Sequence, residues 1–269
     1  MNPLFDAHNH LHNPRLDGIR ESAVASLASQ GLRAAVVNGT SESDWPLVEA
    51  LSKRVPWVIP SFGLHPWKVP ARSAAWRETL LGFLENVSGA VVGEIGLDRW
   101  IEGHDIAAQT ECFEWQLTLA TERNLPVSIH CIQAWGALWD SLKRCPLPAR
   151  GFLIHAYGGS AEMLPGFVRL GAYFSFSPYF LHPRKAAQRE AFAAMPKERI
   201  LVETDAPDLA PPTERNPNPL PGGLNHPANI VLSYEGLADV RGIPLDELAA
   251  QVAENFRRWT ATSFPSACE

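Results

Sequence analysis

The chain has 269 residues and carries 23 Lys and Arg against 29 Asp and Glu, so its formal net charge is −6 at pH 7. Hydrophobic residues make up 46% of the sequence and charged residues 19%, a composition typical of a packed globular protein and not of a disordered or fibrous one. The negative charge argues against a protein that holds duplex DNA through a broad basic face, because such a face neutralises many phosphates with Lys and Arg.

The apolar runs of the sequence are short. Residues 34–37 and 90–92 fall far below the ~20 apolar residues that a membrane-spanning helix requires. The first residues lack the basic and apolar regions of a signal peptide, and no two cysteines form a C-x-x-C pair. We therefore expect a cytoplasmic protein without membrane association and with four reduced cysteines, which are Cys112, Cys131, Cys145 and Cys268.

Eight short apolar segments rich in β-branched residues recur along the chain, each of a length typical of a buried strand. The segments between them have helical spacing; from Ile106 to Glu122, for example, Phe113 and Leu117 lie on one side. We expect strands at Leu4–Ala7, Arg33–Val37, Trp57–Phe62, Ala90–Gly93, Pro126–Ile129, Gly151–Ile154, Ala172–Phe176 and Ile200–Val202.

The spacing of the strands predicts the fold. Successive strands begin about 28 residues apart on average, which is the length of a βα unit. Eight such units favour a single α/β domain over residues 1–269, a (β/α)8 TIM barrel, because strands buried on both faces need helices over the whole outer surface. A proline-rich loop from Ala206 to Pro227 follows the last strand, and two helices, expected at Ala228–Val240 and Leu245–Ala261, would close the barrel.

Six potential metal ligands follow the ends of five predicted strands. Because side chains alternate along a strand, His8 and His10 point to the same side. Active sites of such barrels lie at the carboxyl ends of the strands, where the six side chains are therefore expected to meet. They are His8, His10, Glu94, His130, His155 and Asp205.

Each of these residues also has a purely structural interpretation. Glu94 could hydrogen-bond a neighbouring loop, and Asp205 could cap a turn. His130 and His155 could be hydrogen-bonded core histidines. If all of these interpretations were correct, six potential metal ligands would have gathered at one end of the barrel by coincidence. Four His and two carboxylates suit Mg²⁺, Mn²⁺ or Zn²⁺, and a carboxylate can bridge two ions, so the set predicts two divalent metal ions and hydrolytic chemistry.

Several short motifs occur in order along the chain. They are His8-x-His10, Gly63 to Pro66 (G-L-H-P), Gly93 to Asp98 (G-E-I-G-L-D), Leu125 to His130, Ile154 to Ser160, Glu203 to Pro207 (E-T-D-A-P) and Asn225 to Ala228. Together they resemble the TatD family of metal-dependent deoxyribonucleases, within the amidohydrolase-like barrels. The resemblance covers almost the whole chain, and G-E-I-G-L-D followed by E-T-D-A-P is highly specific.

The resemblance implies a role for each matching residue. It places one metal ion on His8, His10 and Asp205, the second ion on His130 and His155, and Glu94 between them as a bridge. Asp205 would also take a proton from the attacking water, so Asp205 and Glu94 are the expected catalytic residues. His65, in the G-L-H-P turn, would lie near the substrate phosphate; alternatively it is a turn histidine ahead of Pro66. Glu203 either supports the site or forms an ion pair elsewhere.

The sequence departs from the commoner family pattern around the expected site. Cys131 follows His130 where the family often has Arg, and Asp208 stands where an aromatic residue is common. His226 replaces the usual acidic residue, and residues 221–224 replace a segment that is often basic. Each change removes positive charge or alters the surface that a nucleic acid would touch.

Three tryptophans, Trp67, Trp100 and Trp135, follow the third, fourth and fifth strands and are expected in loops at the active-site end. Indole rings can stack on bases, so Trp67 and Trp100 join His65 as candidate substrate-binding residues; the alternative is packing between loops. The remaining tryptophans are expected in the core, namely Trp45, Trp57, Trp76, Trp115, Trp139 and Trp259.

The leading hypothesis is a two-metal phosphodiesterase that acts as an exonuclease on single-stranded or frayed DNA ends, or on a small phosphoester. An alternative is a metal-dependent hydrolase of a small non-nucleic ester, lactone or amide, and a third is a barrel that binds metal and a partner without turnover. Two divalent ions would make the mouth positive, so the net charge of −6 argues against an extended duplex footprint and not against short ends. A monomer is the favoured oligomeric state.

Overall fold

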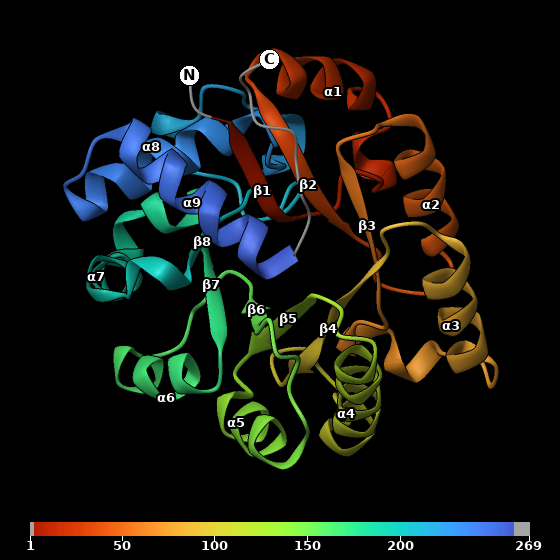
Figure 1. Ribbon diagram of the computed structural model, residues 1–269. Coiled ribbons are helices and arrows are strands. Elements are labelled where there is room, and N and C mark those ends of the chain that lie inside the picture. Colours follow the sequence, from red (N-terminus) through yellow and green to blue (C-terminus); the bar gives the residue numbers. More distant parts are fainter. Residues whose placement is uncertain (1–2, 261–269) are drawn as a thin grey trace.

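The computed structural model describes residues 3–260 and contains one sheet of eight parallel strands, ordered as in the sequence. Figure 1 shows the strands around a common axis with the helices outside them, which confirms the predicted TIM barrel. The strands are β1 (Leu4–Asn9), β2 (Leu32–Asn38), β3 (Val58–Phe62), β4 (Val91–Asp98), β5 (Val127–Ile132), β6 (Phe152–Ile154), β7 (Ala172–Phe176) and β8 (Ile200–Val202).

The helices follow the strands as the spacing predicts. They are α1 (Arg20–Ser29), α2 (Trp45–Arg54), α3 (Trp76–Asn86), α4 (Ile106–Glu122), α5 (Trp135–Arg144), α6 (Leu164–Arg169), α7 (Ala186–Ala194), α8 (Ile230–Arg241) and α9 (Leu245–Thr260). Helix α8 begins later than predicted because Pro227–Asn229 forms a short 3₁₀ helix, capped by the His226 side chain. The predicted end of the last helix, Ala261, lies outside the described residues, as do Met1, Asn2 and Cys268.

Three strands continue past their predicted ends, through the residues that carry the ligand motifs. Strand β4 runs to Asp98 and keeps its parallel pairing with β5 at Gly96 and His130. Gly96 is required there because a Cβ atom at this position would lie 2.0 Å from the carbonyl oxygen of His130. Strand β3, in contrast, begins at Val58, so the predicted strand residue Trp57 lies in the preceding turn and is half-buried.

The first and last strands meet through side-chain and loop contacts. The Thr204 hydroxyl donates to the Asp6 carboxylate at 2.6 Å, and the backbone N–H of Asp205 donates to the carbonyl of His8 at 2.9 Å. Burial raises the pKa of Asp6 to about 7, against the lowering effect of its hydrogen bonds. This seam places the end of β1 beside the loop that follows β8.

The two ends of the barrel differ in polarity. At the amino-terminal end, Phe256 and Trp259 of α9 pack against the inward-facing Phe5 and Leu201, so the last helix closes that end as predicted. The ring centroids of Phe5 and Phe256 are 4.8 Å apart. The carboxyl ends of the strands therefore form the other, polar opening. No helix within residues 3–260 is long and apolar enough to cross a membrane.

Candidate metal centre

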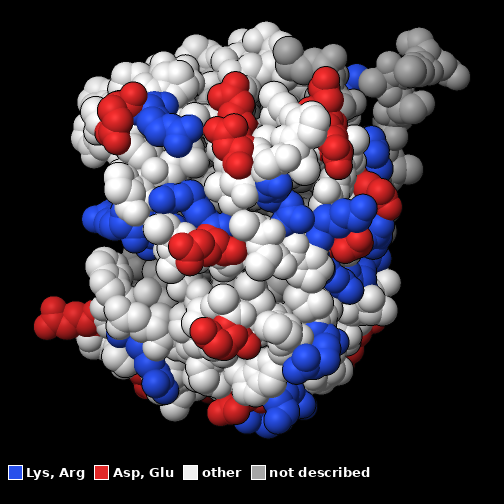
Figure 2. Space-filling view, turned by 90° about the vertical axis from the view of Figure 1, so that its left-hand side faces the viewer, with Lys and Arg blue, Asp and Glu red and all other residues white. Residues whose placement is uncertain are grey.

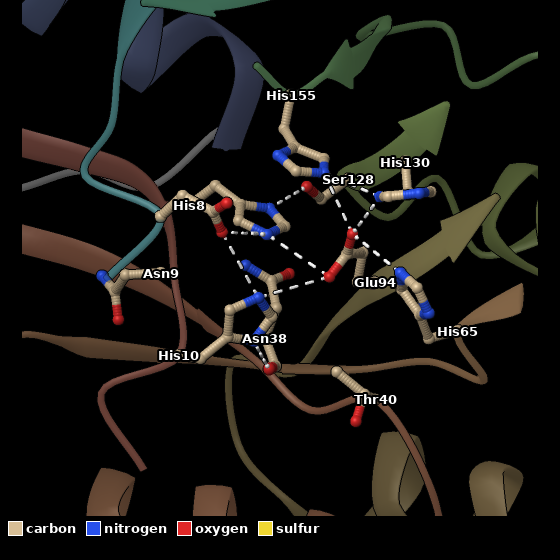
Figure 3. A network of polar contacts seen from close by, with 12 residues as sticks. His8, Asn9, His10, Asn38, Thr40, His65, Glu94, Ser128, His130 and His155 are labelled. Atoms are coloured by element: carbon tan, nitrogen blue, oxygen red, sulfur yellow. Dashed lines mark hydrogen bonds and ion pairs between the residues drawn. The ribbon is translucent and has the colours of Figure 1, made fainter. Parts of the chain in front are cut away.

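Glu94, on β4, occupies the centre of the polar opening. Its side chain is 3% exposed and is surrounded by imidazole rings from other strands and loops, as Figure 3 shows. The two carboxylate oxygens face different sets of nitrogen atoms. Glu94 therefore divides the site into two halves.

The first half contains His8 and His10 of the β1 end and Asp205 of the loop after β8. The Oε2 atom of Glu94 lies 3.5 Å from Nε2 of His8 and 3.3 Å from Nε2 of His10. The Oδ1 atom of Asp205 lies 3.6 Å and 3.4 Å from the same two nitrogens. Four potential ligand atoms thus converge from three strands.

The second half contains three histidines. The Oε1 atom of Glu94 lies 3.0 Å from Nδ1 of His130, 2.9 Å from Nε2 of His155 and 3.3 Å from Nε2 of His65. The halves touch each other, because the rings of His8 and His155 stack with centroids 3.9 Å apart. The structure therefore brings together all six predicted ligands and His65.

Partners behind the histidines fix which nitrogen faces the site. The Nδ1 atom of His10 contacts the carbonyl oxygen of Asn38 at 2.7 Å, and because a carbonyl only accepts, Nδ1 carries the proton and Nε2 presents a lone pair. Nε2 of His130 contacts the Asp98 carboxylate at 2.7 Å, which leaves Nδ1 of His130 facing Glu94. His8 shares a hydrogen bond of 2.7 Å with the Ser128 hydroxyl.

His65 has the opposite arrangement. Its Nδ1 atom accepts the backbone N–H of Trp67 at 3.1 Å, so the Nε2 atom that faces Glu94 carries the proton in the neutral ring. Burial lowers the pKa of His65, which favours that neutral form. His65 therefore presents a hydrogen-bond donor to the site, whereas His10 and His130 present lone pairs.

Glu203 lies behind His155. Its Oε1 atom is 3.7 Å from Nδ1 of His155, and its Oε2 atom accepts a hydrogen bond from the Ser175 hydroxyl. Burial raises the pKa of Glu203, and the contact with His155 opposes this rise. Of the two interpretations of Glu203, the structure favours support of the site.

The site attracts positive charge. Burial alone would raise the pKa of Glu94, but His65, His155 and His8 hold it well below its usual range. Burial opposes protonation of His10, yet hydrogen bonds to Asp205 and Glu94 raise its pKa well above the ordinary value, so Nε2 binds a proton unless a metal ion takes the place of that proton. Burial lowers the pKa of His8 to about 4, so this ring is a neutral donor of an electron pair.

These residues fit two divalent ions. Two atoms that each lie about 2.1 Å from one ion are about 3.0–3.5 Å apart at bond angles near 90–110°. The N–O distances from Glu94 to the four candidate ligand histidines, 2.9–3.5 Å, match that spacing on both sides of the carboxylate. Nε2 of His8 is buried and makes no hydrogen bond within residues 3–260, as expected for an atom whose partner is a cation.

Tryptophans form part of the rim. Trp67 and Trp100 are 40% and 63% exposed, and their ring centroids lie 6.0 Å apart. Trp67 also contacts His65 edge-on at 5.2 Å. Trp135 is not in a loop as predicted, because it begins helix α5 and packs against Tyr157 at 5.1 Å. Two of the three rings thus remain available to a ligand.

Two of the residues that depart from the family pattern have structural partners, and a third is buried. Asp208 forms a bidentate ion pair with Arg15 of the loop after β1, at 2.5 Å and 2.8 Å. His226 accepts a backbone N–H from Ala228 and caps the 3₁₀ helix before α8. Cys131 is buried, and Cys112, Cys131 and Cys145 are free, as predicted.

Some residues of the site were not identified from the sequence. Asp98 and Ser128 were part of quoted motifs but had no assigned role. The strand period offered a signal, since Asp98 lies at an even spacing from Glu94, and Ser128 lies two residues before His130, so each pair shares a face. The carbonyl of Asn38 has no sequence signal, because every residue carries one.

Comparisons with known proteins identify the family of this chain. The sequence profile of the family described as TatD related DNase matches residues 5–261. The uncharacterized metal-dependent hydrolase YjjV of Escherichia coli strain K12 is 30% identical over 254 residues, 94% of this chain and 95% of that protein. A protein of Erwinia tasmaniensis named 3'-5' ssDNA/RNA exonuclease TatD is 28% identical over 257 residues, 95% of this chain and 98% of the relative.

Solved structures show the same relationship. The crystal structure of YjjV, a TatD homologue from Escherichia coli K12, has a TM-score of 0.89 at 27% identity and covers 97% of this chain and 98% of its own. A hydrolase of the TatD family from Entamoeba histolytica has a TM-score of 0.84 at 17% identity, with 96% and 98% covered, a likeness of fold alone. With a profile match over nearly its whole length and a matching barrel, the chain belongs to the TatD related DNase family of metal-dependent hydrolases.

Proposed function

We propose that this protein is a two-metal phosphodiesterase that removes nucleotides from single-stranded or frayed DNA ends. The observation that carries the proposal is the position of Glu94, whose two oxygens each face a separate set of histidine nitrogens. The printed name of the Erwinia relative, an exonuclease on single-stranded DNA and RNA, supports the same substrate class. The three free cysteines within residues 3–260 fit a cytoplasmic location.

In this proposal His8, His10 and Asp205 hold one ion and His130 and His155 hold the other, with Glu94 between them. Two divalent ions bound there would lower the pKa of a water molecule, polarise the phosphate and stabilise charge on its oxygens. Nε2 of His10 and Nδ1 of His130, which face Glu94, suit this role.

The remaining polar residues would act on protons and on the phosphate. Burial favours protonation of Asp205, but His10, His155 and His8 lower its pKa, so this carboxylate is ready to accept a proton from the attacking water. His65 would donate a hydrogen bond from its Nε2–H group to a phosphate oxygen. Both groups lie in the polar opening beside Glu94.

The exposed rings of Trp67 and Trp100 would bind a base next to the scissile phosphate. Base–aromatic stacking contributes about 1–3 kcal/mol per base and tolerates any sequence. Because Trp67 contacts His65 edge-on, a base on the indole pair would place its phosphate near His65. A base inside a duplex cannot offer its face to the rings, which favours single-stranded ends.

The test is hydrolysis of a labelled single-stranded oligonucleotide by purified protein. We expect chelation to abolish hydrolysis, Mg²⁺ or Mn²⁺ to restore it, and His130→Ala to lose it without a change in thermal unfolding. Ser141→Ala, a substitution in helix α5 remote from the polar opening, is the control for expression and purification of a variant protein, and it should keep its activity. Intact oligonucleotide after incubation with a series of metal ions would reject the nuclease.

A second function is favoured by one observation on the rim. At the end of β5, directly after His130, where a cation is common in the family, Cys131 is buried and Ile132 is 38% exposed. This apolar edge suits an uncharged ester, lactone or amide, hydrolysed by the same residues. Salt distinguishes the two functions, since it weakens binding of a polyanionic oligonucleotide steeply and hardly affects a neutral substrate.

A further inference from the structure

The loop between β7 and α7 places a cluster of cations at the polar opening, and the metal centre does not use it. The cluster consists of Tyr179, Arg184 and Lys185, which follow the carboxyl end of β7 in two short 3₁₀ helices. Strands β3 and β7 lie on opposite sides of the barrel (Figure 1). The metal centre therefore lies between this cluster and the Trp67–Trp100 pair, which follows β3 and β4.

One aromatic ring holds both cations in place. The guanidinium carbon of Arg184 lies 5.4 Å from the centroid of the Tyr179 ring, and the ammonium nitrogen of Lys185 lies 5.0 Å from it. Arg184 also donates a hydrogen bond to the Tyr179 hydroxyl at 2.6 Å. Cation–π contacts orient the two side chains but leave their charges unneutralised.

The loop beneath the cluster is well anchored. Arg189 of α7 donates to the carbonyl oxygens of Phe180 and His182 at 2.6 Å and 2.7 Å. Nε2 of His182 lies 3.2 Å from the carbonyl of Ala210, in the loop after β8 that also carries Asp205. The cluster is thus tied to the same loop that supplies a candidate metal ligand.

The cluster differs from Arg15, another cation of this opening, in its charge balance. Arg15 is neutralised by Asp208, but neither Arg184 nor Lys185 has a carboxylate within 4.0 Å among residues 3–260. Figure 2 shows the side of the molecule that carries α7, with Lys and Arg gathered in a band across its middle. Two adjacent unpaired cations on a fixed loop attract anions electrostatically.

We propose that Arg184 and Lys185, held by Tyr179, bind a backbone phosphate of the single strand beyond the scissile bond. The inference rests on the proposed function for the substrate but concerns a different surface. A strand that crosses the opening would place one base on Trp67 and Trp100, its scissile phosphate beside Glu94, and the phosphates of the remaining chain on the cluster. These two cations would bind the nucleic acid in place of the Arg that the family often has directly after His130, where this chain has Cys131.

The test uses binding of a fluorescent phosphorothioate oligothymidylate, which resists hydrolysis, to the metal-loaded protein over a range of salt concentrations. The double variant Arg184→Ala with Lys185→Ala should bind more weakly, and the slope of log Kd against log salt should fall by about 1.4, because each single-strand phosphate contact contributes about 0.7. Arg184→Lys with Lys185→Arg keeps both charges and should restore the wild-type slope.

The matched control removes two cations that also lie over aromatic rings, but at the amino-terminal end of the barrel. Lys143 lies 5.9 Å from the Trp139 ring, and Arg199 lies 5.1 Å from the Tyr173 ring. The control, Lys143→Ala with Arg199→Ala, should leave the salt slope unchanged. Turnover of a small chromogenic phosphodiester, which cannot reach the cluster, should be unchanged in both double variants.

Three results would overturn the proposal. They are an unchanged slope in Arg184→Ala with Lys185→Ala, an equal loss in the control, and no binding by the wild-type protein. If the oligonucleotide binds through the cluster and no metal ion supports hydrolysis, the proposed nuclease activity fails while this binding site stands. If hydrolysis proceeds and the slope is unchanged, only the binding site fails.

Discussion

The metal centre and its rim are constructed differently. At the centre, the candidate ligands come from strand ends or the residues that follow them, and none is more than 7% exposed. Several of their imidazole rings are held by a second hydrogen bond. On the rim, the side chains that a substrate would meet belong to loops, and Trp100 is 63% exposed. The rigid sheet therefore determines the reaction, while the loops determine what is bound.

Asp98 joins the two regions. One carboxylate oxygen accepts the hydrogen bond of His130 at 2.7 Å, and the other accepts the backbone N–H of Trp100 at 2.6 Å. Burial would raise the pKa of Asp98, but the hydrogen bonds from His130 and the Ile101 backbone lower it to about 2. A single carboxylate thus positions both a candidate ligand and a rim loop.

The largest effect is expected at the centre, from Glu94→Gln. The substitution keeps the shape but removes the charge that faces both halves of the site, so we expect activity to fall more than about 100-fold and one ion or both to be lost. Metal content by mass spectrometry and initial hydrolysis rates measure the two effects. Glu102→Gln, an exposed residue of the loop after β4, serves as the control. Full activity in Glu94→Gln would show that the carboxylate does not bridge.

Asp98→Asn should give an intermediate effect, about 10- to 100-fold in metal affinity or activity, because the amide no longer fixes the orientation of His130. Titration with Mn²⁺ and steady-state kinetics measure the change. Asp105→Asn is a suitable control, since Asp105 caps α4 and touches neither half of the centre. Equal metal affinities in the two variants would mean that Asp98 positions only the rim loop that carries Trp100 and does not affect metal binding.

A smaller effect is expected on the rim, from Trp100→Ala. We expect KM for a single-stranded oligonucleotide to rise about 5- to 100-fold, the equivalent of about 1–3 kcal/mol of lost stacking. Turnover of a small phosphodiester should be unaffected, because the Trp100 ring is exposed on the rim and the backbone N–H that binds Asp98 is kept. Leu245→Ala removes another exposed apolar side chain, 40% exposed and far from the opening, and should change neither quantity. A loss of activity on both substrates would show that the ring supports the centre.

Asp208→Asn should have the smallest effect and the opposite sign. It leaves Arg15 without its partner on the rim, so oligonucleotide binding should strengthen about 2- to 5-fold at low salt. Folding stability should change by less than about 1 kcal/mol, since exposed ion pairs contribute little. Binding isotherms and thermal unfolding measure the two quantities. Weaker binding would mean that Asp208 itself contacts the substrate.

The sequence was sufficient for the barrel and for the gathering of the six candidate ligands. Apolar strands at regular spacing determine the fold, and parallel strands in a closed barrel bring their carboxyl ends to one opening. Helix α4 has the predicted bounds, Ile106–Glu122, because its apolar positions recur regularly and Asp105 caps its first turn. The ends of β4 and β5 were less predictable, since hydrogen bonding continues past the last apolar residue.

Features that depend on distant partners could not be predicted. The protonation of His65 follows from a backbone N–H two residues away, whose direction is set by the turn at Pro66. Trp135 was expected in a loop, but its place at the start of α5 depends on packing against Tyr157. The charge of Arg184 matters only because no carboxylate within residues 3–260 approaches it, which composition cannot reveal.

The seam between β1 and β8 makes the site depend on completion of the chain. Asp6 and Thr204, whose hydrogen bond joins these strands, are 198 residues apart in the sequence. During synthesis the two histidines at the end of the first strand emerge early, but Asp205 reaches them only after all eight strands have been made. A truncated product would keep an isolated H-x-H pair and could not assemble the centre. The topology thus prevents a partly made chain from becoming an active hydrolase inside the cell that produces it.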